Sequence, residues 1–254
     1  MNQTLTIVLG FTLPCLMTTL GSALVFFFKK ESKIMNMLTI GLASGIMLSA
    51  SFWSLLNPAL ENAETSWKNL SFLPVGIGFV FGGVFMLILD CISKKCFKIG
   101  ENTGKNRAFK LFSAITIHNI PEGLSVGFTI GTAVATQSAP LPAFMFALGI
   151  AIQNFPEGLA TSLPIYKSIQ NKKKAFWLGT LSGVVEPIFA TAGFFLASSI
   201  KSLLPWLLSF SAGAMIYVII EELIPEIHSE EKHTTGICAF IIGFVIMMLL
   251  DICL

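Results

Sequence analysis

Two short polar motifs interrupt the apolar part of the chain. HNIPEG spans residues 118–123, and QNFPEG spans residues 153–158, 35 positions further on. Each lies inside an apolar run long enough to cross a lipid bilayer. A carboxylate at the bilayer centre costs about 3 kcal/mol on insertion scales, and a proline leaves the carbonyl four residues earlier without its helical hydrogen bond. A chain that accepts both costs twice, with the same residue types, is expected to build one polar site from two helices.

Helical geometry places the polar side chains of each motif on one face. His118 and Glu122 are four positions apart and Asn119 is three positions from Glu122, so the three share a face. The second motif repeats this arrangement, and a carboxylate beside Pro187 adds a third helix. The candidate metal ligands are therefore His118, Asn119, Glu122, Gln153, Asn154, Glu157 and Glu186.

These side chains suit a divalent cation that has shed its hydration water. Imidazole and carboxylate groups bind Zn²⁺, Fe²⁺ or Mn²⁺, and the lack of cysteine among them argues against a thiolate site. Seven groups are more than one tetrahedral ion needs, so two ions sharing a bridging carboxylate stay open as an alternative.

The elements that must position this site are membrane helices. The chain of 254 residues is 54% hydrophobic and 12% charged, with a mean hydropathy of +0.79, which is far from the usual soluble composition. We therefore expect an all-α integral membrane protein with eight transmembrane helices. The predicted spans are 5–28, 37–56, 73–92, 108–130, 143–165, 175–200, 204–223 and 236–254.

Basic residues predict the orientation of these spans. Fourteen of the sixteen Lys and Arg residues fall in the connections after the first, third, fifth and seventh spans, and the exceptions are Lys68 and Lys201. The positive-inside rule makes these connections cytoplasmic, so both termini are expected outside. Residues 93–110 then form a Lys-rich cytoplasmic linker between the third and fourth helices, within a single transporter domain over residues 1–254.

The two motifs lie on consecutive spans of opposite direction, which is typical of an inverted repeat with a binding site near the membrane midplane. A fainter echo pairs SGIM and LLNP of the second span (44–47 and 55–58) with AGAM and LIP of the seventh (212–215 and 223–225). It relates helices 1–3 to helices 6–8 around the central pair.

At these residues the chain resembles the ZIP (Zrt-, Irt-like protein) divalent metal transporters. The resemblance is carried by HNIPEG, QNFPEG and the VVEP of residues 184–187. MLSASFWSLL (47–56) and YVIIEELIPEIH (217–228) resemble the prokaryotic GufA-like branch. The family implies a bundle of eight helices, a binuclear metal site between helices 4, 5 and 6, and alternating access, proposed to be elevator-like.

The resemblance also implies a division of the ligands. One metal would be held by His118, Glu122, Gln153 and Glu157, and the second by Asn119, Asn154, Glu186 and a bridging Glu157. The second helix is implied to line the transport pathway with Met47 and Ser54, with Glu61 as a capture residue at the outer mouth. Many family members carry histidine at the position of Gln153, and an acid can stand at that of Asn154, so the amides here are weaker, neutral ligands.

Together these features predict a divalent metal cation transporter of the cell (inner or plasma) membrane, a multi-pass protein and not an enzyme. Zn²⁺ is the expected substrate, with Fe²⁺, Mn²⁺ and Cd²⁺ as alternatives, and it moves into the cytoplasm as a substrate, with no metal cofactor. The expected partners are metal ions and the lipid bilayer; a homodimer stays open, and no nucleic acid is expected. Two other functions stay open, namely an intramembrane hydrolase, because residues 123–127 match G-x-S-x-G, and a proton- or sodium-coupled solute carrier.

Overall fold

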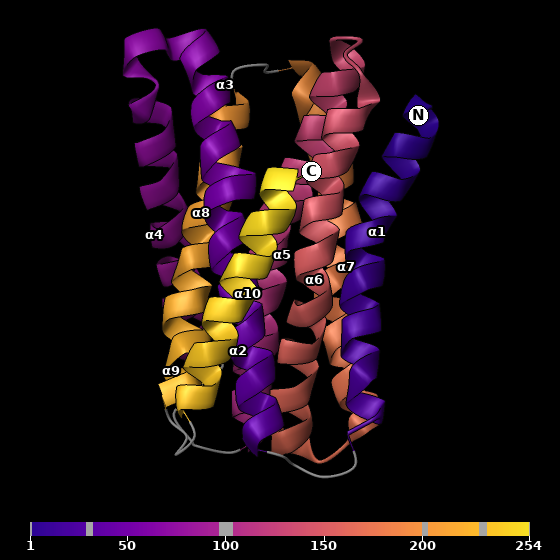
Figure 1. Ribbon diagram of the computed structural model, residues 1–254, viewed down its shortest axis with the longest axis vertical. Helices are drawn as coiled ribbons and strands as arrows, with labels where there is room; N and C mark the ends of the chain where they lie inside the picture. Colours follow the sequence, from indigo (N-terminus) through magenta and orange to yellow (C-terminus); the bar gives the residue numbers. More distant parts are fainter. Residues whose placement is uncertain (1, 29–32, 97–103, 200–202, 229–232, 254) are drawn as a thin grey trace.

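The computed structural model describes residues 2–28, 33–96, 104–199, 203–228 and 233–253, and every regular element in these residues is helical. The all-helical prediction is therefore confirmed. The helices run side by side along the long axis, and α1 begins at the same end of the bundle at which α10 ends (Figure 1). The helices are α1 (Gln3–Ala23), α2 (Lys33–Ala50), α3 (Asn57–Trp67), α4 (Phe72–Cys96), α5 (Gly104–Ala135), α6 (Pro140–Ile169), α7 (Lys172–Ser199), α8 (Leu204–Val218), α9 (Ile224–His228) and α10 (His233–Cys253).

Six segments of the described residues are long and apolar enough to cross a membrane. They are Gln3–Phe26, Ile34–Leu70, Phe72–Ile92, Lys172–Ala197, Leu204–His228 and His233–Cys253. Helices α5 and α6 match them in length but carry the two polar motifs, which lower their hydropathy. The predicted linker over residues 93–110 overlaps the ends of α4 and α5, and its middle, residues 97–103, lies outside the described residues.

The predicted end of the second span at residue 56 is wrong, because the rod continues to Trp67. Its α-helix widens into a π-helical segment, Ser51–Leu56, just before Pro58. A proline lacks the backbone N–H that would donate back along the helix, and a π segment lets the chain continue past such a break. The rod made of α8 and α9 has the same irregularity. Its π-helical segment, Ile219–Leu223, also ends two residues before a proline, Pro225. The two segments paired by sequence thus share one irregularity.

The rods pack as close parallel pairs, because in each pair the contacts advance along both helices in the same direction. The pairs are α1 with α6, α5 with α7, α2 with α10, and α4 with α8. Glycines allow the backbones to touch: a Cβ on Gly158 of α6 would overlap the carbonyl oxygen of Thr18 on α1, and one on Gly21 would overlap that of Phe155. Such small residues are the usual means of close helix packing in lipid.

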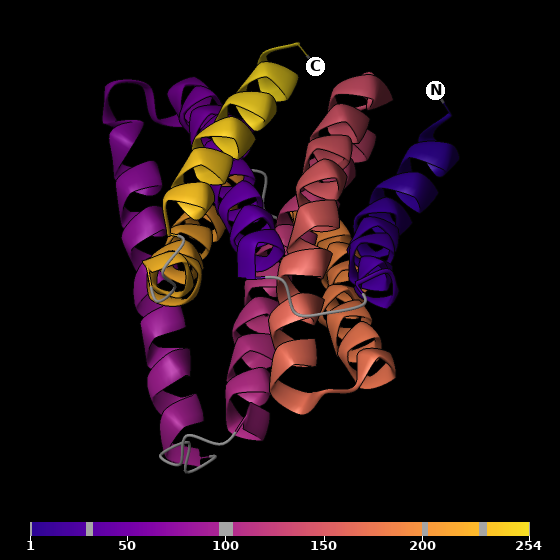
Figure 2. The same ribbon diagram turned by 60° about the horizontal axis from the view of Figure 1, so that its bottom comes forward.

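These pairs assemble into two groups, which lie side by side in Figures 1 and 2. One contains α1, α5, α6 and α7; the other contains the α2–α3 rod, α4, the α8–α9 rod and α10. They meet mainly where α5 contacts α8 and where α2 contacts α6. The largest apolar cluster lies at this meeting, with Met47 of α2, Met215 of α8 and Phe128 of α5 all buried within it.

Candidate metal centre

Three helices of one group bring the seven predicted ligands into the interior. Helix α5 supplies the polar residues of the first motif, α6 those of the second, and α7 supplies Glu186. All seven side chains are buried, with exposed fractions between 0 and 2%. Removing this many polar groups from solvent is costly unless they bind one another or a ligand.

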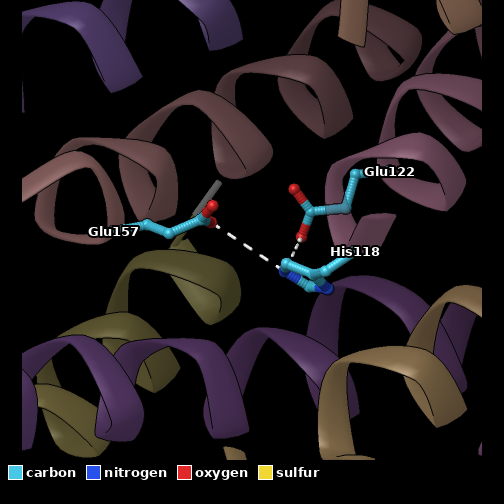
Figure 3. Close-up of side chains that lie close together, drawn as sticks. All are labelled: His118, Glu122 and Glu157. Carbon is cyan, nitrogen blue, oxygen red and sulfur yellow. Dashed lines mark ion pairs between the residues drawn. The ribbon is translucent and has the colours of Figure 1, made fainter. Parts of the chain in front are cut away.

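His118, Glu122 and Glu157 point toward one another (Figure 3). The Nε2 atom of His118 lies 3.4 Å from Oε1 of Glu122 and 3.9 Å from Oε2 of Glu157. One ligand atom from each of the three residues lies within 4.8 Å of the others. Ligand atoms around a tetrahedral ion with bonds of about 2.1 Å are separated by about 3.4 Å, so a small adjustment would close this group around one divalent cation.

The three amide side chains use their N–H groups inside the site. Gln153 donates to Oε1 of Glu122 at 2.6 Å, Asn154 donates to Oε2 of Glu186 at 2.7 Å, and Asn119 donates to the carbonyl of Ser182 at 2.9 Å. The oxygen atom of each amide accepts no hydrogen bond from a described residue. Each amide therefore keeps a neutral oxygen ligand to offer.

Glu157 is the least satisfied carboxylate of the centre. Neither of its oxygens accepts a hydrogen bond from the described part of the chain, and the same holds for Oε2 of Glu122 and for both ring nitrogens of His118. A buried carboxylate without donors is strongly destabilising unless a cation or a proton compensates it. The geometry thus concentrates unused ligand atoms around a single point.

One residue of this centre, Thr18, was not predicted from the sequence. It lies on α1, and its Oγ1 is 3.4 Å from Oε1 of Glu186 and 3.2 Å from the carbonyl oxygen of Pro14. The first helix therefore takes part in the site beside α5, α6 and α7. Nothing in the sequence distinguishes Thr18 from the other threonines of the same apolar run.

Comparison with known proteins decides the family. The model of the ZIP zinc transporter family matches residues 99–251, which is more than half of the chain. The chain belongs to the ZIP zinc transporter family. It is therefore a multi-pass membrane protein and a transporter, not an enzyme, and the resemblance inferred from the two motifs is confirmed.

Individual relatives of this ZIP protein cover nearly its whole length. The zinc transporter ZIP11 of Xenopus tropicalis is 34% identical, over 96% of each chain. The zinc transporter GufA of Myxococcus xanthus is 36% identical, over 85% of each chain. The zinc transporter ZupT of Corynebacterium aurimucosum is 31% identical, over 91% of each chain.

The residues predicted to line the transport pathway of this ZIP protein lie in different surroundings. Met47 is buried in the apolar cluster, and Glu61 is exposed on α3, where it accepts a hydrogen bond from Asn57. Ser54 donates to Oδ1 of Asp251 on α10 at 2.7 Å. Both of these polar groups lie beside Gly149, one helical turn before Gln153 on α6. Asp251, which sequence reasoning left outside the site, thus joins Ser54 one helical turn from the predicted ligands of α6.

The G-x-S-x-G match has no nucleophile geometry in this ZIP protein. Ser125 lies within the continuous helix α5, is buried, and its Oγ is 2.9 Å from Oγ of Ser211 on α8. That motif activates a serine on a sharp strand-to-helix turn, which α5 lacks. The hydrolase alternative is therefore wrong for this chain.

Proposed function

We propose that this ZIP protein carries Zn²⁺ into the cytoplasm through a cation site made by His118, Glu122, Gln153 and Glu157. The supporting observation is that two fully buried carboxylates and an imidazole present unused ligand atoms to one point. The names of its relatives, which are zinc transporters, agree with Zn²⁺ as the cargo. Fe²⁺, Mn²⁺ and Cd²⁺ accept the same mixture of nitrogen and oxygen ligands and are the competing substrates.

Each residue of the site has a role in this proposal. Glu157 and Glu122 supply the negative charge, His118 supplies the nitrogen ligand, and Gln153 supplies a neutral oxygen. Asn119, Asn154 and Glu186 complete the lining. With Glu157 as a shared ligand, these three form the donor set that a second ion would need.

The proposed topology has all eight rods crossing the membrane. Helices α5 and α6 count as spans because they run alongside the six apolar segments and bury their polar motifs against other helices. The junction of α6 and α7, with Lys167 and Lys172–Lys174, lies at the end of the bundle opposite both termini (Figure 2). The positive-inside rule then places this end in the cytoplasm and both termini outside the cell membrane, with residues 1–254 as one transporter domain.

The proposed mechanism is alternating access between the two groups of rods. Glycine-mediated contacts hold the pairs within each group, whereas the site lies in the group of α1, α5, α6 and α7. A shift of this group against the other would move the bound cation between the two sides, as an elevator-like mechanism requires. Ser54, Met47 and Glu61, on the rod that faces α6, would line the outer part of the route.

The test is uptake of ⁶⁵Zn²⁺ by liposomes that contain the purified protein. Uptake above that of empty liposomes, lost in Glu157→Ala and reduced by excess Fe²⁺, Mn²⁺ or Cd²⁺ according to preference, is the expected result. Zinc that binds but does not move would contradict transport. Absence of zinc binding, together with metal-independent uptake of a solute, would favour the proton- or sodium-coupled carrier.

A further inference from the structure

The three carboxylates of the centre are not equivalent, because Glu186 alone has a donor for each oxygen. Asn154 donates to its Oε2 at 2.7 Å, and the hydroxyl of Thr18 lies 3.4 Å from its Oε1. Thr18, Asn154 and Glu186 are between 0 and 2% exposed, so no bulk water competes for these bonds. Glu157, by contrast, accepts no hydrogen bond from any described residue.

Thr18 is fixed in this position by the packing of α1 against two helices. Its carbonyl oxygen lies against Gly158, the last residue of the second motif, and its side chain lies against Gly183, three residues before Glu186. The single hydroxyl proton is shared between the carbonyl of Pro14 and the carboxylate. A charged acceptor makes the stronger hydrogen bond of the two.

Charge balance distinguishes one bound ion from two. One divalent cation neutralises Glu122 and Glu157, the two carboxylates that face His118. The third carboxylate is already stabilised by two neutral donors and does not need a cation for that purpose. A second ion would have to share both oxygens of Glu186 with these donors. Its other unshared ligands would be the neutral amide oxygens of Asn119 and Asn154, which bind a cation more weakly than a carboxylate does.

We infer that Thr18 and Asn154 act as positioning residues that hold Glu186 where a second ion would otherwise bind, so that the site carries one divalent cation at a time. This inference rests on the proposed function, since it concerns how many ions the same site holds. It assigns α1, which carries none of the predicted ligands, a role in the stoichiometry of transport.

The first experiment counts ions bound to the full chain. Purified protein in lipid nanodiscs is dialysed to equilibrium against ⁶⁵Zn²⁺, and bound zinc per chain is measured. Wild type is expected to bind one ion per chain. Asn154→Asp replaces the amide donor by a second carboxylate beside Glu186 and is expected to bind two. Two ions in wild type, or one in Asn154→Asp, would overturn the inference.

The second experiment isolates the hydroxyl of Thr18 in the Asn154→Asp protein. Thr18→Val keeps the branched shape but removes the hydroxyl, which frees Oε1 of Glu186. The second ion should then bind about fivefold more tightly, the equivalent of one lost hydrogen bond of about 1 kcal/mol, while the Kd of the first ion is unchanged. Thr18→Ser restores a hydroxyl and should restore the Kd of the second ion.

The outcomes separate the two proposals. Equal changes in both Kd values, or no change in either, would show that Thr18 does not position Glu186. Two ions bound to wild type, with transport intact, would overturn this inference alone. Failure of wild type to bind any zinc would overturn the proposed function and this inference with it.

Discussion

The two copies of the polar motif share their backbone role but differ in the use of their side chains. In both, the glycine brings a neighbouring backbone close: Gly123 of α5 lies against the carbonyl of Glu186, and Gly158 of α6 lies against that of Thr18. The side chains at the first position of the two motifs differ in their hydrogen bonding. His118 keeps both ring nitrogens without a hydrogen-bond partner in the described residues, whereas Gln153 donates to Glu122.

This difference makes α6 the organising helix of the centre. Gln153 donates to a carboxylate of α5 and Asn154 to a carboxylate of α7, while Glu157 is left without a donor between them. The copy on α5 instead contributes the imidazole, and its Asn119 donates to the backbone of α7. Repetition of a motif therefore repeats the packing of its helix but not the chemistry of its side chains.

Removing the charge of the central carboxylate should have the largest effect. In Glu157→Gln the shape is kept but the anion that lies between both motifs is lost, so we expect zinc uptake to fall to the level of empty liposomes. Glu122→Gln removes a carboxylate that already accepts one hydrogen bond and should leave measurable uptake. Uptake of the two variants side by side makes the comparison, and equal residual uptake would contradict the central position of Glu157.

Replacing the last glycine of the second motif, Gly158, should lower the stability of the folded protein. A Cβ at Gly158 would overlap the carbonyl oxygen of Thr18, so Gly158→Ala must separate α1 from α6 and is expected to cost about 1–3 kcal/mol. The matched control is Gly76→Ala on α4, where a Cβ would meet no atom within 4 Å. Thermal unfolding in detergent measures both. Equal melting temperatures for the two variants would show that the contact between α1 and α6 is not limiting.

Giving the second motif the histidine of the first, by Gln153→His, should strengthen zinc binding. Gln153→His exchanges a neutral oxygen ligand for an imidazole nitrogen, which Zn²⁺ prefers, and releases Oε1 of Glu122 from its hydrogen bond. We expect zinc to bind about tenfold more tightly, or about 1.4 kcal/mol. Titration against a zinc chelator of known affinity gives the Kd, with Gln153→Leu as the control that should weaken binding. An unchanged Kd in both variants would remove position 153 from the ligands.

Much of this arrangement was predictable from sequence because the polar residues were few and lay at helical spacing. The family, the helical class and the polar residues that α5, α6 and α7 bury together were all predicted from residue spacing and motif. That these residues bind metal stays a prediction. The role of Thr18 could not be predicted, since Thr12 and Thr18 lie in the same apolar run and only packing buries one and exposes the other. The continuation past Pro58 was missed for a similar reason, because a proline does not reveal whether a π segment will absorb the break.

Protons should compete with zinc for the titratable side chains of the two motifs. Metal ligands must be deprotonated to bind, so zinc affinity is expected to fall as the pH is lowered from about 8 to about 5.5, when protons compete for His118 and the carboxylates. The amide of Gln153 does not titrate, and Gln153→His would add a second imidazole that does. Uptake measured across this range should therefore fall more steeply in Gln153→His than in wild type. Flat profiles in both proteins would contradict binding through these ligands.

The smallest effect is expected just beyond the motifs, where Ser125 of α5 corresponds to Ala160 of α6. Ser125 shares a hydrogen bond with Ser211 across the meeting of the two groups of rods, but Ser211 also donates to the carbonyl of Pro121. Ser125→Ala therefore leaves Ser211 with a partner. Zinc uptake should stay within about fivefold of wild type, the equivalent of one neutral hydrogen bond of about 1 kcal/mol. Ser211→Ala removes both bonds, the one to Ser125 and the one to the carbonyl of Pro121, and should alter uptake more. If Ser125→Ala abolished uptake instead, this position would belong with the motif residues and the two copies would differ in one more functional side chain.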